Sequence, residues 1–274
     1  MTADPAEPQA GGPRRYRFLV SPKWIAFHVL VVILVVAMVN LGFWQLRRLD
    51  HRRQFNANVR ANANQPVASF DTVEPAFGNP SSVEWRRIQV TGTFDPDRQF
   101  EVVNRSQSSV PGRNIVDALR LTNGSLLLVN RGFLPQTDRA PAVPRGPVQI
   151  VGRLRQTERR GIGQTADAST GVLTQIRRID IDVLSKQFDA PVAPMYIEQL
   201  ESSPADDPSL EPIVAPTLDE GPHLSYAIQW FFFSLCAVVG WVLAVRRSIA
   251  TRSGGTAARR ASGYVPIADD EVLR

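Results

Sequence analysis

Two long apolar runs dominate the pattern of hydrophobic and polar positions along the chain. Residues 24–46 read WIAFHVLVVILVVAMVNLGFWQL, in which only His28, Asn40 and Gln45 are polar. Residues 223–245 read HLSYAIQWFFFSLCAVVGWVLAV and carry no formal charge when the histidine is neutral. Each run has about 20 residues, which is the length of a helix that crosses about 30 Å of hydrocarbon. The pattern therefore predicts two transmembrane helices, one over each run.

Each run has an alternative explanation, and the flanking residues weigh against both. The basic RRYRF stretch before the first run is typical of a signal peptide, but no small-x-small cleavage pattern follows it. Bulky Phe43 and Trp44 end that run instead. The second run would otherwise be a buried core helix, yet Arg246 and Arg247 follow it immediately. We therefore expect an uncleaved anchor and a second span.

Between the two runs, the pattern changes to that of β-strands. WRRIQVTGTF at 85–94 alternates apolar and polar positions, as does VQIVGRL at 148–154, and this is the period of a half-buried strand. LRLTNGSLLLV at 119–129 places Asn123-Gly124 between two strand-like runs, which is a strong hairpin signal. The fold class expected is a membrane protein of α+β type, with two transmembrane helices flanking one outer, mainly antiparallel β domain at 47–222.

Three further segments complete the expected organisation. QLRRLDHRRQFNANVRANAN at 45–64 lacks proline and glycine, so the first helix is expected to continue outward. IDIDVLSKQF at 179–188 is expected to form a short helix with Asp180 as its cap. The stretch 201–222 begins ESSPADDPSLEP and is acidic and proline-rich, so we expect an extended linker there.

Charges beside the second run predict the orientation of the chain. Arginines and a lysine flank the first run on both sides, so that run alone does not decide. Before the second run the charges are acidic, whereas Arg246, Arg247 and Arg252 follow it. Because positive charge marks the cytoplasmic side of a span, both termini are expected in the cytoplasm, with tails at 1–23 and 246–274.

Composition removes several classes of function. The 31 Lys and Arg residues against 26 Asp and Glu are scattered or sit beside apolar runs, so no nucleic-acid surface is predicted. One cysteine excludes an intramolecular disulfide and a paired-cysteine zinc site. Residues 52–222 contain no histidine or cysteine, which excludes a histidine-based catalytic site there. The carboxylates of residues 52–222 are expected to be solvated; they include Asp95, Asp97, Glu101 and Asp117. We therefore predict that the protein is not an enzyme.

The second apolar helix carries two stripes of interest. The first comprises His223, Tyr226, Ala227, Trp230 and Ser234, so an imidazole and aromatic rings lie on one face, which we expect to face a cofactor. The second, of small and polar residues, is expected to pack on the first span or a partner; it comprises Ser225, Gln229, Cys236 and Gly240. The alternative for His223 is an interfacial residue hydrogen-bonded to water or backbone.

Other polar residues lie near the outer ends of the runs. Trp44, Gln45 and Arg48 are either interfacial anchors or a contact surface for a partner or the second span. His51 follows them and, like His223, is expected just beyond the outer surface of the bilayer. His28 is expected near the cytoplasmic face, which makes it the wrong partner for His223.

Several segments together resemble a known family. LGFWQLRRLDHR, VTGTF, LLLVNRGFLP, VQIVGRL and PHLSYAIQWFFFSL occur in family order from about residue 41 to 235. On these the chain resembles the surfeit locus family of cytochrome c oxidase assembly factors. It departs from the family pattern at GRNIVDALRL, after Gly112, where an aromatic residue and a Thr-Pro pair are usual.

The resemblance implies a function, a cofactor and partners. It implies an assembly factor of the bacterial cell (plasma) membrane that assists haem a insertion into the oxidase catalytic subunit. The family histidine implied as haem ligand corresponds to His223, and His51 is a weaker candidate for a second ligand. Haem a would be bound transiently. The oxidase catalytic subunit, the haem a synthesis machinery and the lipid bilayer would be the partners. The residues expected on a face for a partner or for packing of the two helices are Trp44, Gln45, Arg48, Tyr226, Gln229 and Trp230. The alternative is a cofactor-free membrane scaffold or an accessory subunit of a respiratory oxidase complex.

Overall fold

The computed structural model describes residues 16–167 and 171–261. The chain divides into two compact units, which we describe separately. One contains the chain up to Arg52 and again from Glu220 onward, and the other is Arg53–Asp219. The tails expected at 1–23 and 246–274 lie partly outside the described residues.

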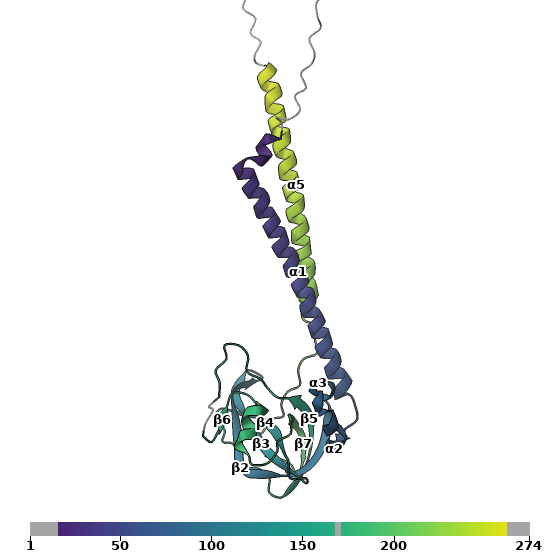
Figure 1. Cartoon of the computed structure of the whole chain (residues 1–274), viewed down its shortest axis with the longest axis vertical. Coiled ribbons are helices and arrows are strands. Elements are labelled where there is room, and N and C mark those ends of the chain that lie inside the picture. The colour runs from purple at the N-terminus through teal and green to yellow at the C-terminus, as the bar shows by residue number, and fades with distance from the viewer. Residues whose placement is uncertain (1–15, 168–170, 262–274) are drawn as a thin grey trace, which may run out of the picture. The chain divides into compact units, whose positions relative to one another are not determined.

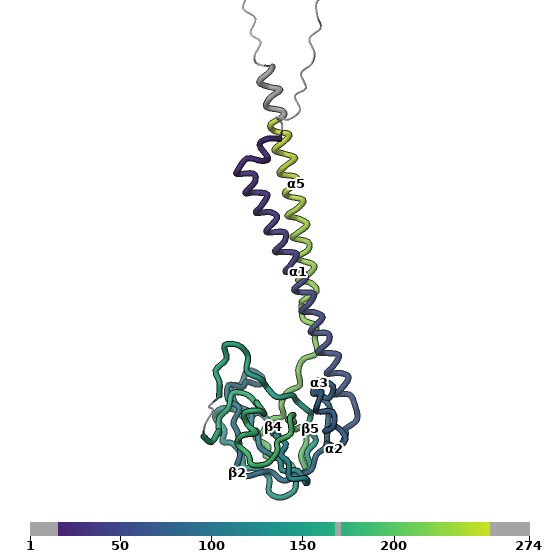
Figure 2. Tube along the Cα trace, viewed as in Figure 1, coloured from purple at the N-terminus to yellow at the C-terminus, as the bar shows by residue number. Residues whose placement is uncertain are grey.

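The first unit is built from two long helices, α1 (Pro22–Ala63) and α5 (His223–Ala261), with a short 3-10 helix, η1 (Arg17–Val20), before them. Both long helices are apolar enough to cross a membrane, with mean hydropathies of 2.6 and 2.0 over their most apolar 18-residue windows. Only 11% and 6% of these windows are buried, which is unlike the core helix of a soluble domain. The two helices run side by side and antiparallel (Figures 1 and 2).

The two helices meet along a seam whose positions recur every three or four residues. The half-buried and buried positions on α1 include His28, Val31, Val35, Met38, Gly42, Gln45 and Leu49, and those on α5 include His223, Ala227, Trp230, Ser234, Ala237 and Trp241. This spacing is that of coiled-coil packing. At Gly42 a Cβ atom would lie 2.7 Å from the ring of Phe231. A larger residue at this position would therefore require the Phe231 ring to shift.

The second unit is a β domain that closes on itself. Its main strands are β2 (Arg87–Gln107), β3 (Val110–Leu121), β4 (Leu126–Pro135), β5 (Pro147–Gln156) and β7 (Met195–Ser203). They follow the order β2-β3-β4-β7-β5, and pairing of β5 with β2 completes a barrel-like ring. All neighbours in this ring are antiparallel except β4 and β7. The short strands β1 (Ala68–Ser69) and β6 (Gln175–Ile176) add to β2.

Short helices surround the ring: α2 (Phe70–Val73), η2 (Glu74–Gly78), α3 (Pro80–Val83), α4 (Ile181–Leu184) and η3 (Ser185–Gln187). One apolar cluster lies within the ring and includes Ile88, Val90 and Phe94 from β2. A second cluster packs Phe100 and Val102 against residues of the α4 segment. The alternation read from 85–94 is confirmed, because its apolar positions are the buried ones.

The predicted turn at Asn123-Gly124 is confirmed, whereas the predicted helix cap at Asp180 is not. Asn123-Gly124 does join two antiparallel strands, with Gly124 at φ +82° and the Asn123 Oδ1 atom accepting from the Ser125 N–H at 3.0 Å. A short helix does follow Asp180, but the Asp180 side chain makes no capping hydrogen bond. The N–H of Ile181, at the start of this helix, donates to the Thr157 hydroxyl instead, at 2.9 Å.

The prediction of an extended linker at 201–222 is wrong for its first half. Residues up to Ser203 complete β7. Leu210 is buried, and Glu211 pairs with Phe133 of β4 through two backbone hydrogen bonds. Asp206 forms an ion pair with Arg131. The acidic character that suggested a solvated spacer therefore comes partly from a residue that neutralises a buried arginine.

The predicted continuation of the first helix beyond its apolar run is confirmed, because α1 extends to Ala63. Its last turns belong to the β-domain unit. Asn62 donates to the carbonyl oxygens of Ser82 and Glu84 at 3.1 and 2.9 Å. Asn56 donates to the carbonyl of Asp219 at 2.9 Å, and Arg60 to that of Leu218 at 3.1 Å. We call the contacts of Asn56 with Asp219 and of Arg60 with Leu218 the clasp, because they join the first and last segments of the β domain.

Candidate functional site

His223 is the first residue of α5 and is half-buried against α1. Its Nδ1 atom lies 2.9 Å from the Oε1 atom of Gln45. Because an amide oxygen can only accept, Nδ1 carries the hydrogen in this arrangement and the lone pair is on Nε2. A histidine held in this tautomer by a second residue is the usual form of a metal-ligating imidazole.

A glycine precedes the turn that leads into His223. Gly221 adopts φ +64°, a conformation that favours glycine, and a Cβ atom there would be in ordinary van der Waals contact with Nε2 of His223, at 3.5 Å. The neighbouring turn is fixed by Pro222, whose carbonyl accepts from the Tyr226 N–H at 3.2 Å and from the Ser225 hydroxyl at 2.8 Å. The ring is thus oriented by Gln45 at Nδ1, and no hydrogen bond to Nε2 is found among the described residues. His223 would hold a haem iron through Nε2, which fits the chemistry of imidazole as a haem ligand.

His51 is not brought to this site. It is exposed and lies six residues after Gln45 on α1, which rotates it about 120° from the face that meets His223. Over the described residues, no group of three or more histidine, cysteine or acidic side chains could hold a metal ion. The antiparallel pair α1 and α5, which we call the helical hairpin or the hairpin, therefore offers a single oriented imidazole rather than a complete set of protein ligands.

His28 makes a different contact within the same pair of helices. The indole Nε1–H of Trp241 donates to Nδ1 of His28 at 2.8 Å, and the two rings pack edge to face with centroids 5.7 Å apart. The ring of Trp24 lies on another side, 5.5 Å away. The sequence does not indicate this pair, because the contact depends on the antiparallel register of α1 and α5. His28 is thus a packing residue of the hairpin.

The two stripes of α5 have the reverse of the expected roles toward α1. Ala227 and Ser234 are only 1% and 6% exposed, so the stripe expected to face a cofactor is the one that packs on α1. The stripe expected to pack, which includes Gln229 and Cys236, is exposed. The physical reason is that the stripe that meets α1 contains the small residues Ala227 and Ser234, which allow the two helices to approach closely.

The expected partner face is divided by the structure. Gln45 and Trp230 lie in the seam between the helices. Trp44, Arg48, Tyr226 and Gln229 are exposed, so they are available to lipid or to another protein. Tyr226, at 47% exposed, makes no side-chain contact with His223 among the hydrogen bonds of the described residues, so it does not support that ring.

The β domain holds a buried ionic cluster that the sequence did not predict. Arg131, with a fully buried side chain, donates from Nη1 to Oδ2 of Asp117 at 3.0 Å and from Nε and Nη2 to Asp206 at 2.9 and 2.5 Å. The expectation that Asp117 is solvated is wrong, because its side chain is 0% exposed. The alternation of side chains along β3 places Asp117 inside the ring. Which face of β3 points inward is fixed only by the register of its pairing with β2 and β4.

The two carboxylates of this cluster differ in their acidity. Burial raises the pKa of Asp117 to about 6, although the hydrogen bond from Arg131 opposes the shift. Burial also disfavours the ionised form of Asp206, but the hydrogen bonds and the charge of Arg131, together with hydrogen bonds from Gln199 and Asp207, outweigh burial and lower the pKa of Asp206. Arg131 is thus shared unequally, with Asp206 as its stronger partner.

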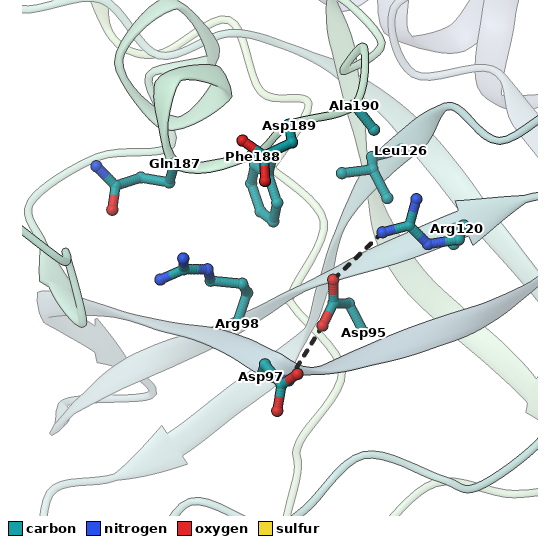
Figure 3. A pocket seen from close by; sticks show the side chains of 9 residues that line it. All are labelled: Asp95, Asp97, Arg98, Arg120, Leu126, Gln187, Phe188, Asp189 and Ala190. Atoms are coloured by element: carbon teal, nitrogen blue, oxygen red, sulfur yellow. Dashed lines mark hydrogen bonds and ion pairs between the residues drawn. The ribbon is translucent and has the colours of Figure 1, made fainter.

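A charged surface pocket of about 380 Å³ lies at the bend of β2 (Figure 3). Asp95 and Asp97 come from that bend, and Asp95 pairs with Arg120 at 3.5 Å. Asp97 is exposed, as predicted. Neither a histidine nor a cysteine is among the residues that line this pocket, so it does not contain a Ser-His-Asp or Cys-His arrangement.

Comparisons with known proteins agree with the layout of the chain. Residues 32–235 match the SURF1 family. An uncharacterized SURF1-like protein of Mycobacterium bovis is 29% identical over 82% of this chain and 84% of its own length. A SURF1-like protein of Monosiga brevicollis is 30% identical over 80% of this chain and 87% of its own. Surfeit locus protein 1 of Takifugu rubripes is 24% identical over 47% of this chain and 62% of its own.

Proposed function

Because the chain belongs to the SURF1 family, we propose that it is a membrane-bound factor that assists haem a insertion into the catalytic subunit of cytochrome c oxidase. In this proposal α1 and α5 span the bacterial cell membrane, both termini are cytoplasmic, and the β domain lies outside. The arginines after the second span and the acidic residues before it support this orientation. The protein acts by holding and presenting a cofactor and is not itself an enzyme.

The observation that carries the proposal is the contact between His223 and Gln45. A ring nitrogen with a fixed lone pair is the ligand that haem iron prefers, and haem supplies its own four equatorial nitrogens. One oriented imidazole is therefore sufficient to hold the group transiently. Gln45 is a positioning residue, because it sets the tautomer of His223 without facing Nε2 itself.

A second candidate function is a scaffold that holds oxidase subunits and binds no cofactor. The observation that favours it is the exposed polar stripe on α5, which includes Ser225, Gln229 and Cys236. Polar side chains that face lipid are costly and are usually covered by a partner helix. Both functions need the hairpin, but only haem binding needs Nε2 of His223.

The test is to purify wild type and the His223→Ala, His28→Ala and His51→Ala variants from a haem-a-producing host and compare haem per protein. We expect His223→Ala to lose most of its Soret absorbance, while the other two retain it. His28→Ala is the matched control, since it also removes a hydrogen bond between the helices. Undiminished haem in a folded, membrane-bound His223→Ala protein would reject the ligand role and favour the scaffold.

The role of Gln45 has its own readout. Gln45→Leu keeps the size of the side chain but removes the acceptor at Nδ1, so the two tautomers of His223 become close in energy. We expect the Gln45→Leu protein to bind haem more weakly, with a shifted Soret maximum. Gln45→Glu, which retains an acceptor oxygen, should restore binding.

A further inference from the structure

A second cavity of the β domain, of about 410 Å³, lies between β2 and the loop that precedes β5. Its lining includes Thr93, Phe94, Gln99, Asp117, Val143 and Arg145. Of these, Asp117 is fully buried and Phe94 is 3% exposed, whereas Arg145 is exposed at the rim. The cavity therefore joins the surface of the domain to its buried ionic cluster.

All the donors of Arg131 are already used. A guanidinium has five N–H groups. Nε and one Nη2 hydrogen go to Asp206, and one Nη1 hydrogen goes to Oδ2 of Asp117. The remaining two go to the carbonyl oxygens of Pro141 at 3.3 Å and Ala142 at 3.1 Å. Arg131 thus has no hydrogen left for the other oxygen of Asp117.

That oxygen, Oδ1 of Asp117, is buried and has no hydrogen-bond partner among the described residues. Gln99 is the other donor to this carboxylate, and it too binds Oδ2, at 3.3 Å. The cluster also has one arginine between two carboxylates, so it carries one excess negative charge when both are ionised. Buried carboxylate oxygens normally find a donor, and a buried excess charge normally finds a counter-charge.

We propose that this cavity binds a ligand bearing a protonated amine, whose N–H donates to Oδ1 of Asp117. The ammonium group supplies the two things that the cluster lacks, which are a hydrogen-bond donor and one positive charge. An alkyl chain on the nitrogen packs against the apolar part of the wall, at Phe94 and Val143. The amine is either a free small molecule or a lysine side chain of another polypeptide, because the two present the same group.

The test measures binding to the full-length protein in detergent by isothermal titration calorimetry. The probes are n-butylammonium, Nα-acetyl-lysine amide and, as a neutral control, n-butanol. We expect at least one amine to bind at pH 7.5, and n-butanol to bind at least about tenfold more weakly, which is what loss of one charge-assisted hydrogen bond predicts. Binding of the lysine amide indicates a polypeptide source, and binding of n-butylammonium alone indicates a free amine.

Variants separate the site from a general effect of charge. Asp117→Asn should reduce amine binding at least about tenfold, whereas Asp97→Asn, at an exposed acid on the same strand, should leave it unchanged. Because Asp117→Asn also alters the cluster around Arg131, Val143→Trp provides a second variant that fills the cavity from the loop side. Arg145→Ala should strengthen binding by removing a like charge at the rim. Equal binding of amine and n-butanol, or amine binding that survives Val143→Trp in a folded protein, would overturn the proposal.

Discussion

The two units of this protein treat buried polar groups in different ways. In the helical hairpin, polar side chains meet in isolated neutral pairs, His223 with Gln45 and Trp241 with His28. In the β domain, full charges are buried together, with Arg131 between two carboxylates. Each arrangement matches its surroundings, since a neutral pair costs little to bury, whereas a buried charge needs several partners.

The difference has a functional consequence. A neutral pair leaves one side of a ring uncommitted, and His223 has such a side at Nε2. The ionic cluster instead uses every donor of its arginine and leaves an acceptor unmatched at Asp117. The hairpin therefore offers a lone pair to a Lewis acid, and the β domain offers a carboxylate oxygen to a hydrogen-bond donor. The following changes test how far this distinction holds, from the largest expected effect to the smallest.

Arg131→Met should break the ionic arrangement altogether. It leaves Asp117 and Asp206 buried without their shared cation, and loss of one partner from a buried pair costs about 3–5 kcal/mol. Chemical denaturation of the purified protein, followed by the fluorescence of Trp85 in the β domain, measures this change. Arg120→Met is the matched control, because Arg120 is 50% exposed in its pair with Asp95 and should cost under about 1 kcal/mol. Equal losses in the two variants would contradict the proposed role of burial.

The raised pKa of Asp117 predicts a pH dependence of stability. Between the ordinary value of 3.8 and about 6, the folded protein holds a proton on Asp117 that the unfolded chain releases. The contribution of Asp117 to the free energy of unfolding therefore falls as pH rises through this window, by roughly 2–3 kcal/mol at about 1.36 kcal/mol per pKa unit.

The measurement compares wild type with Asp117→Asn at pH 4, 5, 6 and 7. Wild type should lose stability relative to the variant as pH rises, because the amide does not titrate. Asp206, with its lowered pKa, acts in the opposite sense and loses its contribution only as pH falls toward the ordinary carboxyl range. A constant difference between the two proteins across this range would show that Asp117 stays ionised.

The smallest effect is expected in the hairpin. Trp241→Phe removes the donor to His28 but keeps an aromatic ring in the seam, and a hydrogen bond between membrane helices contributes about 0.6 kcal/mol on average. Unfolding in mixed detergent micelles should show a change of this size. A loss of several kcal/mol would mean that the hairpin depends on its polar pairs as strongly as the β domain does.

Sequence patterns predicted the elements more fully than the contacts between them. The apolar runs, the alternation at 85–94 and the Asn123-Gly124 turn each depend on neighbouring residues, and each was found. The burial of Asp117 and the contact of His28 with Trp241 depend on register between distant segments. Composition also gave a wrong prediction at 201–212. An acidic residue near prolines, such as Asp206, is expected to be solvated, but Asp206 forms an ion pair with buried Arg131.

For the candidate site, the sequence indicated His223 but not what orients it. Gln45 was placed on a contact surface, and its bond to Nδ1 appears only when the two helices are paired. The stripe of α5 that packs on α1 was predicted wrongly for a related reason. The sequence of one helix shows which residues share a stripe, but the neighbouring helix decides which stripe is covered. Here α1 covers the stripe that contains Ala227 and Ser234.

The clasp makes the β domain an interchangeable module. Asn56 and Arg60 hold the backbone at Leu218 and Asp219, so the points where the chain enters and leaves the domain are neighbours. Domains with adjacent ends tolerate transplantation and circular permutation. Residues 53–219 should therefore fold as a free-standing β domain, and a short linker joining Arg52 to Glu220 should leave the two apolar helices without their insert. The domain can in the same way be lengthened, shortened or replaced by engineering while the two apolar helices keep their register.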